Sequence, residues 1–578
     1  MSKVNDSVKD TEVSDTQPSR RKFLKLSAGS GAALAAGAVA GTLPAQKALA
    51  DDFSPFDVDP SAPGASRAIA AFRLKVRAGQ QHLLDTYRLG HQLDNNDEQR
   101  YAGDNYYASF TKTLPSDQFG EVDPAAFQAL QRAMRTGRRN DFNAIPLDPT
   151  AARRLANPQG AFKFEVSALD NHATRINPSH TFRSAELAAE MGEVYWQALA
   201  RDVPFINYDT DATVAAAVSD LNNFSAPPGA TMGGQITSGT LFRGETPGDL
   251  SGPFVSQFLL KDFNFGPAIN IQRYGVPLAG VDFMTDQANW LNVQRGGAPA
   301  ENLVFDPVRR YIYNYRALGE YVHTDVSFQA YLNAALILLG YGGGAIDQGN
   351  PYANGDIDNQ GGFTSLGGPF VLDMVTKAAN LSLTGAWFQK WRVHRLLRPE
   401  AYAGRVHFQM NGQRSYELHP DILNSDAAAR VFSQNGTYFL PMAFTEGSPT
   451  HPSYPAGHAT IAGACTTILK AFFNEDFIIP NPVQADATGE NLLAYGGGDL
   501  TVGGELNKLA NNVAIARDAA GVHYRQDGIQ GIFAGEQQAI ALLQDQSRTL
   551  NESNFDGFTL TKFDGTRIKI IDGRIRNA

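Results

Sequence analysis

Apolar positions recur every three or four residues through much of the chain, a spacing typical of helices that bury one face. Strong helix formers fill the same segments, as in AELAAEMGEVYWQALAR at 185–201. Alternating strand patterns are scarce, so the sequence predicts a mostly helical fold. The expected helices span 185–201, 325–339, 370–398, 457–473, 506–520 and 531–543.

Segments rich in Gly, Pro, Asn and Asp separate these helices, notably 226–252 and 342–368, and predict long loops. Near the end of the chain, 558–571 surrounds Asp564-Gly565, a dipeptide that favours a tight turn, and predicts a β-hairpin. No linker-like stretch divides 51–578, so we expect one unit. Its parts are a loopier region over 51–320, a helical core over 320–545 and a tail over 546–578.

The first 50 residues have the features of an export signal. SRRKFLK at 19–25 carries a twin arginine, an apolar stretch rich in Ala and Gly follows, and Ala48-Leu49-Ala50 has the small residues of a cleavage site. A disordered basic tail is the alternative, but it does not explain this order of features. Because the twin-arginine route carries folded proteins, we expect the mature protein in the periplasm or outside a bacterial cell.

The formal net charge of −10 argues against nucleic acid or an anionic membrane as the main partner. Any anion site must therefore be a local cluster of positive charge. The single cysteine, Cys465, excludes an internal disulfide and a thiolate metal centre, and it lies in an apolar helical run. After the signal, no apolar stretch approaches the ~18 residues of a membrane span, and the longest candidate, 331–341, has the length of a buried helix.

The first of three notable segments places two cations before a proline. Lys390 and Arg398 are eight positions apart in KWRVHRLLRP, about 80° around a helix, so both could lean to one side. Pro399 restricts the residue before it, and a helix end is expected there. Taken alone, the segment fits a solvated basic face equally well.

The second segment, HPSYPAGHAT, leads into an apolar helix. Gly457 at a helix start lets backbone N–H groups approach an anion, and the helix dipole favours negative charge there. His458 lies in that first turn, where it could exchange a proton with a bound oxyanion. His451 precedes it across a proline-rich turn. A lone histidine is more often an ordinary core or surface residue.

The third segment, ARDAAGVHYR, places Arg517 six positions before His523. On one continuous helix the two would point about 120° apart, but Gly521 favours a helix end that could bring His523 back. Together, the three segments supply what a tetrahedral oxyanion needs. They offer two planar arginine forks, a lysine, helix-start amides and two histidines.

This combination resembles the signature shared by the vanadium haloperoxidases and their phosphatase relatives: K-x(7)-R-P, then P-[SA]-G-H, then R-x(5)-H. WRVHRLLRPEA, HPSYPAGHAT and AGVHYR are similar to segments of bromoperoxidases from marine algae and cyanobacteria, the red-algal type above all. The similarity extends over most of the chain, through DNHATRINPSH and FRSAELAAEMGEVYWQALARDVPF within 170–205 and HTDVSFQAYLNAALILLG at 323–340.

The resemblance implies a mostly α fold in which two four-helix bundles supply the pocket, with long loops and minor β-hairpins. It also implies a vanadate cofactor. By that resemblance Lys390, Arg398 and Arg517 bind the vanadate oxygens. Gly457 contributes a backbone N–H, and His523 is the axial vanadium ligand.

By the same resemblance, His458 is the acid–base histidine and Asp325 pairs with Arg517 behind the anion. His451 occupies a position that is histidine in bromoperoxidases and an aromatic ring in chloroperoxidases. The implied reaction oxidises bromide, or iodide, with hydrogen peroxide to hypohalous acid, which halogenates small organic molecules. Lys390 and the two histidines would be catalytic. Related enzymes form dimers or larger shells, so we expect a homo-oligomer.

One residue departs from the family pattern. Ala456 stands where the family usually has Ser, so a hydroxyl that would hydrogen-bond the oxyanion is missing. Losing one such bond costs about 1–3 kcal/mol, or roughly one to two decades in affinity, unless a water replaces it.

Two other functions fit the same pocket. In an acid phosphatase, His523 would be the nucleophile and His458 the acid for the leaving group, because phosphate and vanadate are nearly isosteric. A non-catalytic oxyanion-binding protein, which Ala456 favours, would bind phosphate tightly without turnover. Separately, DQGNPYANGDIDNQ at 347–360 has hard oxygen ligands that could hold a structural calcium ion. It lacks the EF-hand spacing, and a polar loop is the simpler interpretation.

Overall fold

The computed structural model describes residues 64–89, 92–552 and 554–578. The export signal predicted over 1–50 lies outside these residues, and so does the expected boundary at residue 50, which stays a prediction. The chain divides into two compact units, Met1–Arg77 and Ala78–Ala578. Everything that follows on packing and on the site concerns the second unit.

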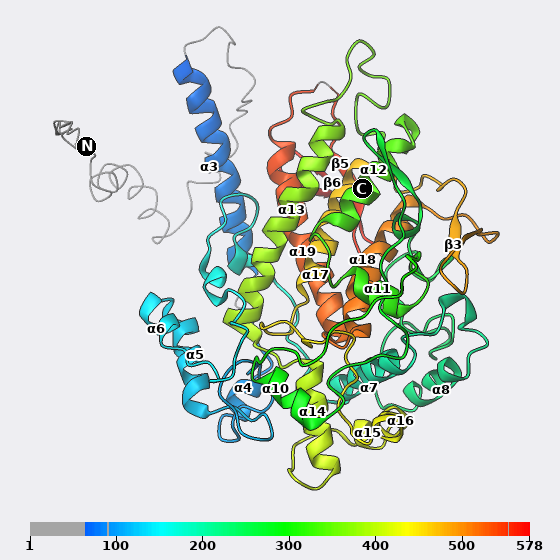
Figure 1. Cartoon of the computed structure of the whole chain (residues 1–578). Helices are drawn as coiled ribbons and strands as arrows, with labels where there is room; N and C mark the ends of the chain where they lie inside the picture. The colour runs from blue at the N-terminus through cyan, green and yellow to red at the C-terminus, as the bar shows by residue number, and fades with distance from the viewer. Residues whose placement is uncertain (1–63, 90–91, 553) are drawn as a thin grey trace, which may run out of the picture. The chain divides into compact units, whose positions relative to one another are not determined.

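Helices dominate the described chain, so the mostly α prediction is confirmed (Figure 1). None of the helices in these residues combines the length and apolar character needed to cross a bilayer. The longer helices are α3 (Gly64–Arg88), α5 (Pro124–Thr136), α7 (Ala185–Leu199), α8 (Ala212–Leu221), α10 (Gln287–Gln294), α12 (Gln329–Gly340), α13 (Gly368–Phe388), α14 (Pro399–Met410), α16 (Asp426–Asn435), α17 (Gly457–Phe472), α18 (Val502–Ala519) and α19 (Arg525–Ser547). The shorter helices are α4 (Asp97–Arg100), α6 (Arg139–Asn143), α9 (Gln257–Leu260), α11 (Tyr315–Tyr321) and α15 (Pro420–Leu423).

Four helices, α13, α17, α18 and α19, form a bundle at the core, and α17 contacts each of the other three (Figure 1). Two glycines bring α17 and α19 together. A Cβ atom added to Gly463 would lie 2.1 Å from the backbone oxygen of Ile532, and one added to Gly535 would lie 2.0 Å from that of Thr460. The two backbones therefore touch, which fixes the starts of α17 and α19 relative to each other.

A second group of helices collects around α7, which contacts α8, α14, α15 and α16, while α18 links this group to the core bundle. The side chain of Ser184 caps α7 by accepting a hydrogen bond from the N–H of Leu187. Most side chains of α7 are buried, as expected for a helix packed on several sides. The two groups correspond to the predicted pair of bundles, with the short α15 included in the second.

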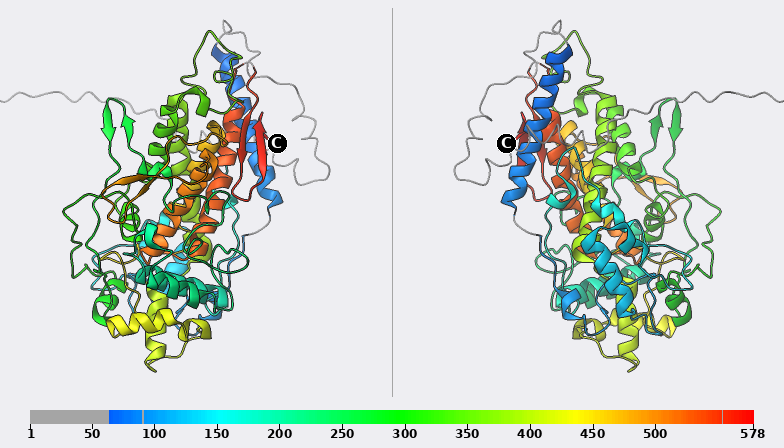
Figure 2. Two further views of the ribbon diagram at one scale, coloured as in Figure 1. Left: turned by 90° about the vertical axis from the view of Figure 1, so that its right-hand side faces the viewer. Right: turned by 90° about the vertical axis from the view of Figure 1, so that its left-hand side faces the viewer.

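Strands are few and antiparallel. The hairpin predicted at 558–571 is confirmed, with Gly565 in its turn at φ +83° and a third strand added after it. Figure 2 shows the hairpin of β1 and β2 extending away from the helices. The pairs are β1 (Phe263–Phe265) with β2 (Ala268–Asn270), β3 (Val483–Ala485) with β4 (Leu492–Ala494), and β5 (Phe558–Thr561) with β6 (Arg567–Ile571), which also pairs with β7 (Arg574–Asn577).

The helix expected over 370–398 is shorter than predicted. It ends at Phe388, a π-helical turn follows over Gln389–His394, and Arg395 then adopts a left-handed conformation with φ 38°. Pro399 begins α14, because proline suits the first position of a helix. Lys390 and Arg398 therefore lie on two elements, and their predicted separation around one helix does not apply.

Candidate functional site

The junction between α13 and α14 brings two buried cations to one loop. Lys390 lies in the π-helical turn, and its Nζ donates hydrogen bonds to the carbonyl oxygens of Pro452 (2.8 Å) and Ser453 (2.6 Å). Arg398 is the N-cap of α14, and its Nε donates to the carbonyl oxygen of His451 (3.0 Å). Both side chains thus reach the segment that leads into α17.

A glycine at the end of α18 shapes the third segment. Gly521 has φ +86°, and the N–H of Val522 donates to the carbonyl oxygen of Arg517 (3.1 Å), a pattern that closes helices with a left-handed glycine. The chain turns back as Gly521 predicted, and His523 follows directly. Burial lowers the pKa of His523 well below its ordinary value, and the charges of Arg398, Lys390 and then Arg517 lower it further, so Arg517 lies near the returned ring.

Arg517 carries an unpaired donor. One terminal nitrogen, Nη1, donates to the carbonyl oxygen of Val322 (2.7 Å), but its buried Nε has no hydrogen-bond partner among the described residues. A buried N–H without an acceptor is costly. The orphaned donor therefore indicates an acceptor that the chain itself does not supply.

The ring of His523 is oriented through both nitrogens. Its Nδ1 lies 2.7 Å from Oδ2 of Asp527, and its Nε2 lies 3.0 Å from Nη1 of Arg398. A carboxylate at Nδ1 keeps the ring proton there, so Nε2 retains its lone pair. His523 therefore offers Nε2 as a nitrogen ligand on the Arg398 side.

Asp527 was not among the residues predicted from sequence. It occupies the third position of α19, where its carboxylate accepts from the N–H of Tyr524 (3.3 Å) and from the hydroxyl of Ser453. Burial raises the pKa of Asp527 to about 6, although the bond from Ser453 and the charge of Lys390 oppose the rise. The available signal was an acid four positions after His523, in the first turn of the next helix.

The start of α17 adds backbone donors. The helix begins at Gly457, and Ala456, its N-cap, provides no side-chain hydrogen bond. The first N–H groups of a helix have no acceptor within the helix, and its dipole makes this end positive. The N–H of Ala456 itself donates to the carbonyl oxygen of Asp527 (2.8 Å), which ties the start of α17 to that of α19.

His458 pairs with Asp325. Its Nε2 lies 3.1 Å from Oδ1 of Asp325, and its side chain is 28% exposed. The sequence predicted that Asp325 would pair with Arg517, but its hydrogen-bond partner is His458, and Arg517 acts on it through charge. The helix expected from residue 325 begins at Gln329, so Asp325 lies in the loop between α11 and α12 and can reach His458.

Opposing effects set the pKa of this pair. Burial raises the pKa of Asp325, but the bond from His458 and the charges of His458 and Arg517 outweigh it, so the pKa is lowered. Burial and then the charge of Arg517 lower the pKa of His458, against the opposing effect of Asp325. The pair therefore favours an ionised carboxylate beside a histidine that is easily kept neutral.

His451 lies against Arg398 and an indole ring. Its Nδ1 is 3.0 Å from Nη2 of Arg398, and its ring centroid is 4.8 Å from that of Trp387. Burial, followed by the charges of Lys390 and Arg398, lowers the pKa of His451 well below its ordinary value. The site thus contains a polar, neutral ring next to the guanidinium.

The cations repel one another in this buried region. Burial lowers the pKa of Arg398 to about 9 and that of Arg517 to about 10. Burial and the charge of Arg398 hold the pKa of Lys390 well below its ordinary value. An anion among them would favour the charged form of each group and raise these pKa values.

The donor set fits a tetrahedral oxyanion. Among the described residues, no group of three His, Cys, Asp or Glu side chains could hold a metal cation. The site instead offers one histidine nitrogen, three cations, uncapped helix amides and the orphaned Nε of Arg517. In the segment 347–360, Asp347 and Asp356 accept hydrogen bonds from within the loop, and calcium there stays a prediction.

Comparisons with known proteins agree with this chemistry. Residues 372–552 match the family described as "VCPO second helical-bundle domain". The chain is 37% identical over 542 residues to a vanadium-dependent bromoperoxidase of Ascophyllum nodosum, covering 89% of this chain and 94% of that protein. It is 33% identical over 594 residues to the enzyme of the same name from Corallina pilulifera, covering 87% and 98%. The homohexameric structure of the second vanadate-dependent bromoperoxidase (AnII) from Ascophyllum nodosum aligns with a TM-score of 0.84 at 31% identity, over 93% of this chain and 96% of that one.

Proposed function

The chain belongs to the vanadium-dependent bromoperoxidase family, and from that premise we propose that it oxidises bromide, or iodide, with hydrogen peroxide to hypohalous acid, which halogenates small organic molecules. The observation that supports this proposal most strongly is that one site contains three buried cations, the uncapped start of α17 and a histidine oriented by a carboxylate. When bound, vanadate supplies a Lewis acid that activates peroxide toward halide without a change in its oxidation state.

In this proposal Lys390, Arg398 and Arg517 hold the oxygens of vanadate, and the N–H of Gly457 contributes a further donor. Their lowered pKa values and the orphaned Nε of Arg517 support the assignment, because an anion relieves both the repulsion and the unmade bond. His523 provides the ligating Nε2. Two of the three N–H groups of the Lys390 ammonium bond backbone oxygens, and the third remains to polarise a bound oxygen.

His458 is assigned the proton transfers. Its lowered pKa keeps the ring neutral and able to accept a proton, and the carboxylate of Asp325 stabilises the imidazolium that results. Because Nε2 is held by Asp325, Nδ1 is the nitrogen left to exchange the proton.

His451 is assigned to the halide step. Its neutral ring, held against Arg398, makes the surroundings of the oxyanion polar without adding charge. The family resemblance at this position favours bromide and iodide over chloride.

The deciding experiment is a paired assay on purified protein. The metal-free protein is titrated with vanadate in phosphate-free buffer while bromination of a phenolic dye by peroxide and bromide is followed, and phosphate-ester hydrolysis is measured without vanadate. Bromination that appears with vanadate and falls as phosphate competes is the expected result. Ester hydrolysis without vanadate-dependent bromination would instead establish a phosphatase, and inactivity in both assays a binding protein.

Export and assembly belong to the same proposal. The twin-arginine sequence at 19–25 supports export to the periplasm or the medium. A homo-oligomer is supported by the hexameric AnII relative and by two exposed apolar side chains of α3, Leu83 and Tyr87, which share one side of the helix. A second copy of the chain would cover them.

A further inference from the structure

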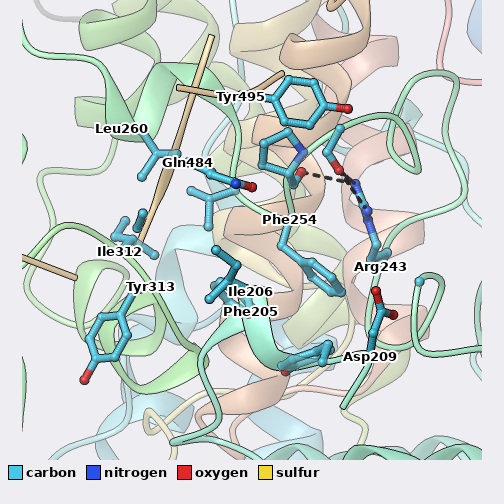
Figure 3. Close-up of a pocket in the computed structure, with 16 residues that line it drawn as sticks. Phe205, Ile206, Asp209, Arg243, Phe254, Leu260, Ile312, Tyr313, Gln484 and Tyr495 are labelled. Carbon is cyan, nitrogen blue, oxygen red and sulfur yellow. Dashed lines mark hydrogen bonds between the residues drawn. The ribbon is translucent and has the colours of Figure 1, made fainter. Parts of the chain in front are cut away.

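A cavity of about 260 Å³ lies among loops and helix ends, and none of its lining residues belongs to the oxyanion site (Figure 3). The segment before α8, the loop that precedes α9, and strand β3 contribute its walls. A dry apolar cavity of ~150 Å³ is enough to hold one benzene ring. This cavity therefore has room for a single-ring molecule with a small substituent.

Aromatic rings form one wall. Phe205 and Phe254 are stacked, with centroids 5.2 Å apart and an interplanar angle of 3°, and the ring of Tyr208 lies 4.7 Å from that of Phe254. Leu260 and Ile312 complete the apolar lining, and Figure 3 shows them across the cavity from Phe254. Flat apolar walls of this kind favour a flat aromatic ligand.

Two polar groups of the lining lack partners. The hydroxyl of Tyr208 is buried and has no hydrogen-bond partner among the described residues, and Tyr208 is only 2% exposed. Burial raises the pKa of Tyr208 well above its ordinary value, so the hydroxyl stays protonated and can donate. Figure 3 shows the amide of Gln484 between Leu260 and Phe254, while the hydroxyls of Tyr313 and Tyr495 point away. The hydroxyl of Tyr208 has no accessible surface in the cavity, so a ligand oxygen can reach only the side-chain amide of Gln484, for which no hydrogen bond is found among the described residues.

The charges around the cavity select a neutral ligand. The guanidinium of Arg243 lies over the ring of Phe254 and donates to the carbonyl oxygens of Asp249, Gly252 and Pro253. Because these carbonyl oxygens already accept from the guanidinium of Arg243, it is not available to bind an anionic ligand. The carboxylate of Asp209 lines the same cavity and would repel an anion.

We propose that this cavity binds a small neutral aromatic molecule bearing a hydroxyl or carbonyl oxygen. The ring packs against Phe205 and Phe254, and its oxygen accepts a hydrogen bond from the side-chain amide of Gln484. The site is separate from the oxyanion site and does not depend on vanadate chemistry.

The test uses 4-fluorophenol as the probe, followed by fluorine NMR on the full-length, vanadate-loaded protein without peroxide or halide. Saturable binding at one site per chain is expected. Gln484→Leu should weaken it about tenfold, because the hydrogen bond to the ligand oxygen is lost. Fluorobenzene, which offers no oxygen, should bind the wild type and Gln484→Leu equally.

Tyr208→Phe is the control, because Tyr208 belongs to the same lining but its hydroxyl has no accessible surface there. Its affinity for 4-fluorophenol should equal that of the wild type. Tyr402→Phe, whose hydroxyl is also buried and unpartnered among the described residues but lies outside the lining, should likewise bind the probe as the wild type does.

Absence of saturable binding would overturn the proposal, and so would equal weakening in Gln484→Leu and Tyr208→Phe. Tighter binding of 4-fluorobenzoate than of 4-fluorophenol would contradict a neutral ligand. Dye bromination with peroxide and bromide is measured on the same samples. Failure of that assay alongside intact 4-fluorophenol binding would reject the peroxidase function and leave the cavity site standing.

Discussion

At the residue scale, the site depends on how tightly the ligating ring of His523 is held. Asp527 fixes one ring nitrogen, and the carboxylate of Asp527 is itself fixed by Ser453 and by the N–H of Tyr524. All of these groups are buried, so water cannot replace a lost partner easily. A histidine restrained in this way needs no reorganisation when it binds an oxyanion.

Asp527→Asn should lower the affinity for vanadate about 10- to 100-fold, because the amide no longer fixes the proton on Nδ1 of His523. Vanadium NMR or equilibrium dialysis measures this directly, without relying on turnover. Asp545→Asn is the matched control, since Asp545 pairs with His82 at 2.7 Å outside the oxyanion site. An unchanged affinity in Asp527→Asn would show that the carboxylate does not orient the ring.

Ala456→Ser should raise the affinity for vanadate roughly tenfold or more, because the added hydroxyl lies at the start of α17 and supplies one more hydrogen bond. The same titration measures it. Thermal unfolding of both proteins serves as the control for stability, since serine is also a good N-cap. An affinity equal to that of the wild type would indicate that a water already fills the place of the hydroxyl.

Asp325→Asn should move the acidic limb of the pH profile of bromination to lower pH. Asp325 raises the pKa of His458 by stabilising its imidazolium, so removing the carboxylate lowers that pKa further. The neutral, proton-accepting form of His458 then persists to lower pH. The profile of kcat/KM against pH gives the measurement, and a shift to higher pH would contradict the assigned pairing.

At the element scale, the junction between α13 and α14 positions the cations. Arg395 adopts its left-handed conformation while its guanidinium bonds both carboxylate oxygens of Glu98, with Nε–Oε2 at 2.6 Å. This anchor holds the turn that separates Lys390 from Arg398. Both therefore reach the loop before α17 from different directions, which a single straight helix could not arrange.

Gly535→Ala should destabilise the protein by about 1–3 kcal/mol, because the new Cβ atom meets the backbone of α17 and forces α19 away. Chemical denaturation measures the loss. Gly340→Ala is the control, since a Cβ atom at Gly340 meets nothing within 4 Å. Vanadate affinity should fall in Gly535→Ala as well, because the starts of α17 and α19 lose their fixed spacing. Equal stability of the two variants would contradict this account.

At the scale of the whole molecule, the sequence was sufficient to predict features that depend only on residues close together in the chain. Gly521 and Gly457 marked a helix end and a helix start because glycine permits a left-handed turn and a close approach of backbone. Pro399 predicted a helix end, but the preceding helix ends earlier, at Phe388, and the proline instead begins α14. The partner of Asp325 depends on how the loop after α11 packs on α17, which no periodicity in the sequence specifies. Which helices contact one another in the core bundle likewise depends on residues far apart in the sequence, so the sequence pattern did not predict it.

Assembly is tested at this scale too. Replacing Leu83 and Tyr87 with glutamate should dissociate the homo-oligomer, because the charges would be buried when a second copy covers this side of α3. Light scattering coupled to size exclusion measures the mass. A variant with both charges and an unchanged mass would place the interface elsewhere.

The burial of Cys465 affects how well the protein resists oxidation by the hypohalous acid that it is proposed to produce. The thiol is fully buried in α17, donates to the carbonyl oxygen of Val375, and has its pKa raised by burial, so it forms little reactive thiolate. Among the described residues, a diffusing oxidant therefore meets sulfur first at Met232 and Met410, which are 65% and 38% exposed. Oxidation of these two surface methionines to the sulfoxide would leave the helical core chemically intact. We therefore expect oxidative damage during turnover to begin at these two positions.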